Sequence, residues 1–431
     1  MKFMERILHY VWKYGLYGAS PLCTTEGLPL SVIDPGIENR DAGPDFFNAK
    51  IRIADTLWAG SVEIHGRASD WMRHHHDQDK AYDGVILHVV GVADADVVRT
   101  NGEPIPMLQL PVPPAVQANV EWLLSKELPV SCLPRLSEVD PVHITGWLDA
   151  LLTERLERKS ADLLKLLTHY QGDWNEVCYV SLTRSFGFGV NNDAFERLAR
   201  SLPFRYIQKQ RISSSQVEAM LFGQAGMLNE TYPCDYYRLL QREYAFLRHK
   251  FGLTPLDEFV FKQLRLRPHS FPHVKLAQLA AIWCRHDTLF SKIIEAHTPG
   301  EIKALFRLLP SEYWLTHYQF SHVSTTSEKW IGEKARDILL INTVVPLYFA
   351  YGQHKKLPEY CGRAIRLLET IHPERNHIIT TFQQGGISVK HAGDTQALIQ
   401  LRREYCEKRK CLYCRIGFRL LKRCGEEGAK K

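Results

Sequence analysis

Hydrophobic and polar residues alternate in the first part of the chain, and this alternation predicts a β-hairpin. Residues 48–53 have a period of two, residues 54–56 form a turn-like break, and residues 57–64 have the pattern of the returning strand. The short apolar run at residues 85–90 is typical of a strand that is buried on both faces. The expected order of elements is a helix (2–14), a strand (30–33), the hairpin, a helix (69–82) and a strand (85–90).

The pattern changes after the proline-rich residues 110–114, where we expect the first domain to end. From residue 115 onward, apolar residues recur at helical spacing, so we expect a predominantly helical region with a core of its own. The predicted organisation has three parts, which are residues 1–114, 115–400 and 401–431. The helices predicted in the second part cover residues 144–167, 215–226, 235–251, 276–284, 299–309, 334–351 and 359–371.

Composition and compartment change this picture little. The chain has 431 residues, of which 45% are hydrophobic and 24% are charged, as is usual for a globular protein of two or three domains. No apolar run approaches the ~18 residues of a transmembrane helix, and the ten cysteines are scattered along the chain. We therefore expect a cytoplasmic protein with no membrane contact.

Charge is distributed unequally. Residues 1–114 carry 10 Lys or Arg and 15 Asp or Glu, whereas the remaining residues carry 44 and 33. The first part is therefore acidic, with a balance of −5, and the rest is basic, with a balance of +11. An acidic centre with basic surroundings suits a polyanion such as DNA or RNA, although a charge of +11 over more than 300 residues also describes a mildly basic surface.

Two carboxylates lie at corresponding positions of the predicted hairpin. Asp45 precedes the first strand and Glu63 ends the second, in the segments Gly-Pro-Asp-Phe and Val-Glu-Ile-His. The hairpin would bring these two side chains together, and converging carboxylates bind hard cations such as Mg²⁺ or Mn²⁺. This pattern predicts a metal site for phosphodiester hydrolysis.

The pair Pro44-Asp45 with Glu63-Ile64-His65 resembles the PD-(D/E)XK, or restriction-endonuclease-like, nuclease superfamily. The resemblance covers about the first quarter of the chain. It implies an α+β fold with an αβββαβ core, followed here by the helical region. It also implies that Asp45 and Glu63 hold the ion, with the Ile64 carbonyl as a third oxygen and Glu5 of the first helix as an additional carboxylate.

The sequence departs from that superfamily at His65, where a lysine usually activates water. Because Glu63 and His65 are two apart in a strand, both should point to one face. His65 is then either a general base or a metal ligand that favours Mn²⁺ or another transition metal. Lys80, in the predicted helix, is the candidate for a displaced lysine. The same helix carries His74, His76 and Asp79 as further candidates to face the cleft.

The basic C-terminal segment contains three closely spaced cysteines. Cys406, Cys411 and Cys414 form a C-x₄-C-x₂-C pattern, which is suited to Zn²⁺ or an iron–sulfur cluster, or to reduced thiols on a basic helix. Some nucleases that resemble this class hold an iron–sulfur cluster between distant cysteines and a C-terminal group. That resemblance makes Cys361 the expected fourth ligand.

Several segments also resemble an uncharacterised bacterial family with a domain of unknown function, namely residues 43–46, 62–65, 69–71, 87–90 and 411–417. Three functions follow from the sequence. The first is a metal-dependent nuclease that acts on DNA or RNA. The second is a catalytically inactive nuclease-like fold that binds nucleic acid, and the third is a helical scaffold for protein interactions.

Overall fold

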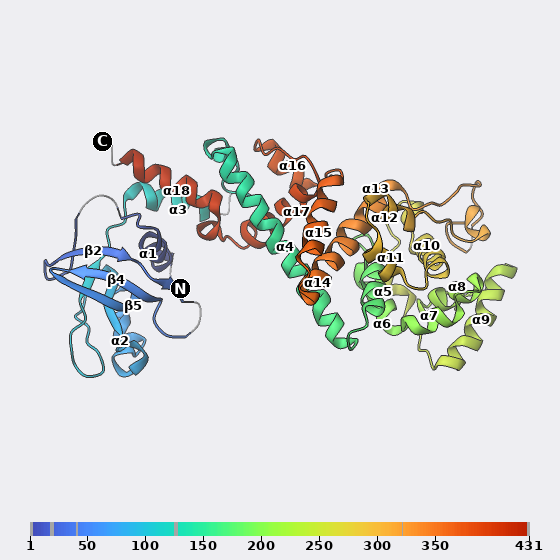
Figure 1. Cartoon of the computed structure of the whole chain (residues 1–431), viewed down its shortest axis with the longest axis horizontal. Coiled ribbons are helices and arrows are strands. Elements are labelled where there is room, and N and C mark those ends of the chain that lie inside the picture. The colour runs from blue at the N-terminus through green and yellow to red at the C-terminus, as the bar shows by residue number, and fades with distance from the viewer. Residues whose placement is uncertain (1–2, 18–20, 40–41, 125–127, 321, 429–431) are drawn as a thin grey trace. The chain divides into compact units, whose positions relative to one another are not determined.

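The chain divides into two compact units. The computed structural model describes residues 3–17, 21–39, 42–124, 128–320 and 322–428 (Figure 1). The first unit contains Met1–Leu148, Thr380–Ile387 and Ile399–Lys431, and the second contains Asp149–Ile379 and Ser388–Leu398. The C-terminal segment therefore belongs with the N-terminal sheet, instead of forming the separate third part that the sequence predicts.

A mixed sheet forms the centre of the first unit. Its main path runs in the order β1-β2-β4-β5-β6-β7, and β3 pairs with β4. Strands β1, β2, β4 and β5 pair antiparallel, whereas β5, β6 and β7 pair parallel. The strands are β1 (Leu22–Cys23), β2 (Pro29–Asp34), β3 (Ile37–Glu38), β4 (Phe46–Ile53), β5 (Thr56–Arg67), β6 (Val85–Val92) and β7 (Met107–Gln109).

The hairpin of β4 and β5 confirms the prediction from the alternating pattern. Ile53 pairs with Thr56 at the turn, where Ala54 takes a positive φ of 50°, and Phe46 pairs with Val62 at the other end. The register shifts between Phe46 and Ala49, which is typical of a β-bulge. The hairpin thus fixes which residues at the start of β4 face which residues of β5.

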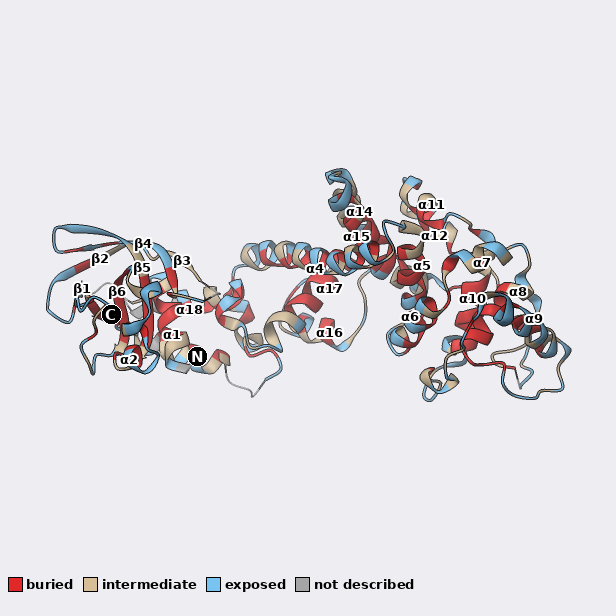
Figure 2. Cartoon of the chain, turned by 90° about the horizontal axis from the view of Figure 1, so that it is seen from below, coloured by how far each residue is buried: buried red, intermediate tan, exposed pale blue. Residues whose placement is uncertain are grey.

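Helix α1 (Phe3–Tyr14) packs on one face of the sheet. Its buried residues Ile7, Leu8, Val11 and Trp12 form an apolar stripe at helical spacing. A side chain at Gly91 of β6 would contact Leu8, which places α1 over that face. Buried residues follow α1 and the central strands in Figure 2.

The connection from β5 to β6 covers the opposite face, where Trp71 packs against His88 of β6. The predicted helix over residues 69–82 is wrong. The segment forms one α-turn, α2 (Asp70–Arg73), and two 3₁₀ turns, η1 (His76–Gln78) and η2 (Lys80–Tyr82). His75 takes a left-handed conformation with a φ of 60°, which ends the helix after one turn.

Helices complete the first unit. They are α3 (Pro114–Leu124), the 3₁₀ turn η3 (Leu133–Glu138), the π-turn η8 (Leu401–Cys406), the 3₁₀ turn η9 (Cys411–Tyr413) and α18 (Arg415–Gly428). Helix α18 packs against α3, and the ring of Phe418 lies 4.8 Å from that of Tyr14 in α1. The core around the sheet therefore extends past the predicted boundary at residue 114.

The second unit is helical, as predicted, and its described residues contain no named strand. The helix predicted over residues 235–251 has the same bounds in the structure. Three described helices begin in one unit and end in the other, namely α4 (Pro141–His169), α16 (His377–Gln384) and α17 (Ala392–Gln400). The remaining helices are α5 (Trp174–Ser185), α6 (Asn192–Ser201), α7 (Phe204–Gln210), α8 (Ser214–Gln224), α9 (Asp235–Phe251), α10 (Pro272–Arg285), α11 (Leu289–Glu295), α12 (Pro299–Leu305), α13 (Glu333–Leu339), α14 (Val345–Lys355) and α15 (Pro358–Thr370). Short helical turns are η4 (Glu258–Val260), η5 (Pro268–Ser270), η6 (Glu312–Leu315) and the π-turn η7 (Leu340–Val344).

Among the described residues, no helix has both the length and the apolar character that a membrane crossing requires.

Candidate metal centre

Asp45 and Glu63 lie side by side at the end of the hairpin. Because Phe46 pairs with Val62, the antiparallel register brings Asp45 opposite Glu63. The backbone N–H of Asp45 donates to Glu63 Oε2 at 3.0 Å, and the N–H of Ile64 donates to Asp45 Oδ2 at 2.9 Å. Each carboxylate is therefore held by the backbone of the neighbouring strand, and the predicted adjacency of the two residues is confirmed.

Four histidines extend this pair on the face of the sheet beneath α2. Nδ1 of His65 lies 2.9 Å from Nε2 of His88, and Nε2 of His65 lies 3.2 Å from Nδ1 of His74. Glu63 Oε1 is 3.5 Å from Nε2 of His65 and 3.4 Å from Nε2 of His76. His65 is therefore held between a buried imidazole and the buried carboxylate.

Three of these histidines have the geometry of metal ligands. The potential ligand atoms of His65, His74 and His76 all lie within 4.8 Å of one another. Among the described residues, no other group of three His, Cys, Asp or Glu residues has ligand atoms this close. His65 and His76 are buried and their rings stack with centroids 5.3 Å apart, while His74 is exposed.

Burial and crowding keep these imidazoles neutral. Burial, together with the neighbouring histidines, lowers the pKa of His65 to about 2, and burial with His76 lowers the pKa of His88 to about 3. Burial also lowers the pKa of His74 and of His76. Neutral imidazoles have the free lone pairs that a metal ion binds.

Two acidic groups, Asp45 and Glu63, lie in the same place. Burial and then the charge of Asp45 raise the pKa of Glu63 well above its usual range, although the N–H of Asp45 opposes this shift. Nε2 of His9 in α1 lies 3.3 Å from Asp45 Oδ2. Burial lowers the pKa of His9, but the contact with Asp45 and the charge of its carboxylate more than offset this effect, so the pKa is raised. A cation between these groups would offset the cost of ionising the buried Glu63 beside Asp45.

The other predicted site residues occupy different positions. Glu5 precedes His9 by four residues on α1, and its charge raises the pKa of both His9 and Glu63. Ile64 adjoins the pair through its backbone N–H. Lys80 is exposed in η2, where its charge acts on Asp83, and among the described residues no contact joins it to Asp45 or Glu63. The structure does not support Lys80 as the displaced lysine, because the helix expected to carry it does not form.

His9 and His88 are the site residues that the sequence did not reveal. His88 lies in the middle of an apolar run, where a single histidine gives no signal beyond strand parity. The pairing of Glu63 with His88 in the parallel β5–β6 ladder places it on the face of Glu63 and His65. His9 gives only one signal, which is its helical spacing of four residues from Glu5.

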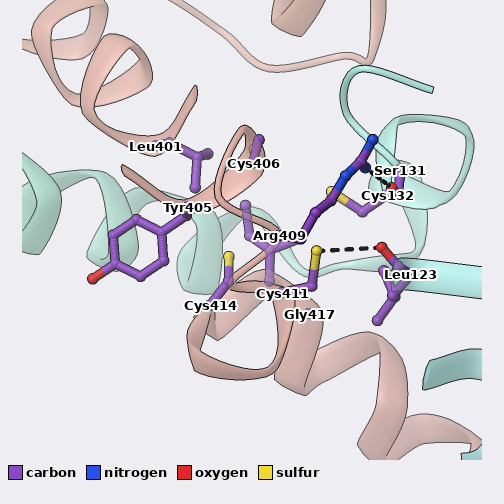
Figure 3. Close-up of a pocket in the computed structure, with 11 residues that line it drawn as sticks. Leu123, Ser131, Cys132, Leu401, Tyr405, Cys406, Arg409, Cys411, Cys414 and Gly417 are labelled. Carbon is purple, nitrogen blue, oxygen red and sulfur yellow. Dashed lines mark hydrogen bonds between the residues drawn. The ribbon is translucent and has the colours of Figure 1, made fainter. Parts of the chain in front are cut away.

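The three C-terminal cysteines line a pocket in the first unit. Cys406, Cys411 and Cys414 share it with Cys132, which precedes η3 (Figure 3). Cys361, the predicted fourth ligand, belongs to α15 in the second unit, where its thiol donates to the carbonyl of Phe349 at 3.7 Å. The structure thus groups the predicted triad with a cysteine that the sequence did not single out.

Comparison with known proteins gives a family but no activity. Neither the search of curated proteins nor that of solved structures found a match. The family described as "Protein of unknown function (DUF2851)" matches residues 5–377, which include Asp45, Glu63 and Cys132 but not the three C-terminal cysteines. The chain belongs to the DUF2851 family of proteins of unknown function.

Proposed function

We propose that the first unit is a metal-dependent phosphodiesterase that acts on DNA or RNA. The observation that carries this proposal is the pair of half-buried Asp45 and buried Glu63, with two neutral imidazoles within 3.5 Å of Glu63 Oε1. A divalent ion bound by both carboxylates would supply Lewis-acid activation of water and stabilise the charge that develops on the phosphate.

The donor set fits such an ion. Asp45 and Glu63 offer carboxylate oxygens, which suit Mg²⁺ and Mn²⁺, and His65 and His76 add imidazole nitrogens, which favour Mn²⁺ or another transition metal. Glu5, on the first turn of α1, adds negative charge near Glu63.

In this proposal His65 binds or orients the ion instead of removing a proton from water. Its Nδ1 is occupied by His88, which leaves Nε2 directed at Glu63 and His74. A general base works best when its pKa is near the working pH, and the pKa of His65 is far lower, at about 2.

The order of elements supports the restriction-endonuclease-like interpretation. Helix α1 precedes an antiparallel set of strands that ends in the β4–β5 hairpin, and a crossover containing α2 leads to the parallel strand β6. The basic balance of residues 115–431 supports a polyanionic substrate.

The second candidate is a catalytically inactive fold that binds nucleic acid. Two observations favour it. Each carboxylate already accepts a backbone N–H, and among the described residues no lysine contacts the pair. Among the described residues of the helical second unit, no comparable site supports a scaffold role.

A cleavage assay separates these candidates. Wild type is incubated with single- and double-stranded DNA and RNA in the presence of Mn²⁺, Mg²⁺ or EDTA. We expect metal-dependent cleavage that Asp45→Asn and Glu63→Gln abolish. Asp55→Asn, which makes the same chemical change in the exposed hairpin turn, should cleave like wild type. Binding without cleavage under every condition would favour the inactive fold, and neither binding nor cleavage would favour the scaffold.

A further inference from the structure

Four cysteines from two distant parts of the sequence line one pocket of the first unit. Cys132 lies between α3 and η3, Cys406 ends η8, Cys411 begins η9, and Cys414 directly precedes α18. The pocket has an empty volume of about 390 Å³, part of it open to solvent, and is lined largely by apolar atoms (Figure 3). These residues do not take part in the carboxylate site.

Hydrogen bonds hold the two parts of the chain together at this pocket. Arg409 takes a positive φ of 50° and donates from Nη1 to Ser131 Oγ at 2.6 Å and from Nη2 to the Leu128 carbonyl at 3.1 Å. Arg402 donates to the Pro129 carbonyl. Two guanidinium groups therefore fix the segment before Cys132 to the loop that carries the other three thiols.

The four thiols differ in burial. Cys414 is buried, and Cys132, Cys406 and Cys411 are half-buried. The thiol of Cys411 donates to the Leu123 carbonyl at 3.3 Å (Figure 3). Four cysteines that line one pocket form a ligand set suited to a metal centre, which binds them as thiolates.

We propose that Cys132, Cys406, Cys411 and Cys414 bind an iron–sulfur cluster. Each thiol would lose one proton on binding an iron of a cluster assembled from iron and inorganic sulfide. The cluster would join the loop before η3 to the C-terminal segment, which are separated by 274 residues in the sequence (406 − 132).

The spacing of the thiols does not match a single zinc ion. Tetrahedral Zn²⁺ with Zn–S bonds of ~2.3 Å holds its sulfur atoms roughly 4 Å apart. Yet within the described part of the chain, which includes all four cysteines, no three of these thiols have sulfur atoms within 4.8 Å of one another. A [4Fe–4S] cluster holds its thiolates further apart, because each thiolate binds a different iron.

The full-length protein should be purified anaerobically and its iron, acid-labile sulfide, zinc and visible absorption measured. We expect iron and sulfide in equal amounts, with the broad visible absorption of an iron–sulfur cluster. Cys132→Ser should lose this absorption and most of the iron. Cys361→Ser, which alters a half-buried thiol in the second unit, should keep both.

A second measurement on wild type covers the case in which Cys132→Ser does not fold. Alkylation of the native protein, followed by mass spectrometry, should find these four thiols protected, and removal of iron by a chelator should expose all four. Zinc without iron, no metal in wild type, iron retained by Cys132→Ser, or alkylation of the four thiols before chelation would each overturn the proposal. None of these results depends on nuclease activity, so this proposal and the proposed function stand or fall separately.

Discussion

The carboxylate of Glu63 has neighbours of two kinds. Asp45 adds negative charge beside it, and the rings of His65 and His76 approach Oε1 as neutral donors or acceptors. Behind His65, the fully buried His88 fixes the orientation of the ring. The chemistry of the site therefore depends on residues that would not touch an ion as well as on those that would.

His88 provides a test of this dependence. Because His88 holds Nδ1 of His65, His88→Gln should weaken Mn²⁺ binding by about 10–100-fold, which is the usual cost of losing a residue that orients a ligand. Titration calorimetry of the purified variant measures this change. His143→Gln, in α4, makes the same substitution outside the site and should bind like wild type. Equal Mn²⁺ affinity in the two variants would contradict the claim that His88 positions His65 for binding the ion.

Lys275 in the second unit gives a prediction about stability and pH. Burial lowers its pKa from 10.5 to about 8, although Nζ donates to Gln278 Oε1 at 3.0 Å. The unfolded chain therefore binds the Lys275 proton more tightly than the folded chain does. Between about pH 8 and 10.5 this difference makes the free energy of unfolding rise with pH. Below about pH 8 the burial of the charged ammonium lowers the free energy of unfolding by its full amount. At about 1.4 kcal/mol per pKa unit, the cost is roughly 3 kcal/mol.

Lys275→Met should therefore raise the free energy of unfolding at pH 7, with a smaller gain at pH 10. Denaturant unfolding at the two pH values measures the difference from wild type. Lys334→Met removes an exposed charge in α13 and should change stability little at either pH. A gain for Lys275→Met that is equal at pH 7 and pH 10 would contradict the assigned cost of the buried charge.

Among single residues, those whose roles follow from local pattern were predictable. Asp45 and Glu63 mark the two ends of an alternating hairpin, so their adjacency follows from period and turn alone. His88 and Cys132 could not be found in this way. His65, the partner of His88, lies 23 residues away on the neighbouring parallel strand. Cys406 lies 274 residues after Cys132 in the sequence (406 − 132).

At the scale of elements, the predictions that the structure confirms are those made from a strong hydrophobic periodicity. The hairpin and the long helix α9 follow their patterns closely. The segment over residues 69–82 is mostly polar, so no apolar stripe at helical spacing selects a helix. Tertiary contacts of Trp71 and His76 determine its turns instead. Because that helix does not form, it cannot direct Lys80 toward the carboxylates as expected.

Close packing of α8 against α9 gives a prediction at this scale. A Cβ at Gly223 would lie 2.1 Å from Cγ of Tyr244, whose hydroxyl donates to Gln224 Oε1. Gly223→Ala should destabilise the second unit by about 1–3 kcal/mol, because the ring cannot move without breaking that bond. Gly146→Ala, in α4 with no atom within 4 Å of the new Cβ, should instead stabilise by ~0.5–1 kcal/mol. Thermal unfolding of both variants measures the sign, and a neutral Gly223→Ala would contradict the packing.

At the scale of the whole molecule, the first unit is assembled from three segments of the chain. Sequence pattern places a boundary at the prolines of residues 110–114, yet α3 and α18 continue the core beyond it. No local signal connects residue 421 to a sheet that ends at residue 109, because the connection is made through tertiary packing alone. This long-range assembly is the part of the fold that the sequence could not predict.

Leu421 tests this assembly. Its side chain is fully buried in α18, so Leu421→Ala should cost about 2–5 kcal/mol. Hydrogen exchange should then become faster in β5 and β6 of the first unit, while α8 and α10 of the second unit keep their wild-type rates. Ile212→Ala, at a side chain that is 97% exposed, is the control. Faster exchange confined to α18 would mean that the C-terminal helix is not part of the sheet's core.

The measurement that tests the central claim most directly is a crystal structure of the wild-type protein soaked in Mn²⁺, with anomalous scattering recorded. The predicted result is one anomalous peak within coordination distance of both the Asp45 and the Glu63 carboxylates, with His65 or His76 as a further ligand, and no such peak in Asp45→Asn. A site without a peak at millimolar Mn²⁺, or a peak that survives Asp45→Asn unchanged, would contradict the metal centre and the phosphodiesterase activity that depends on it.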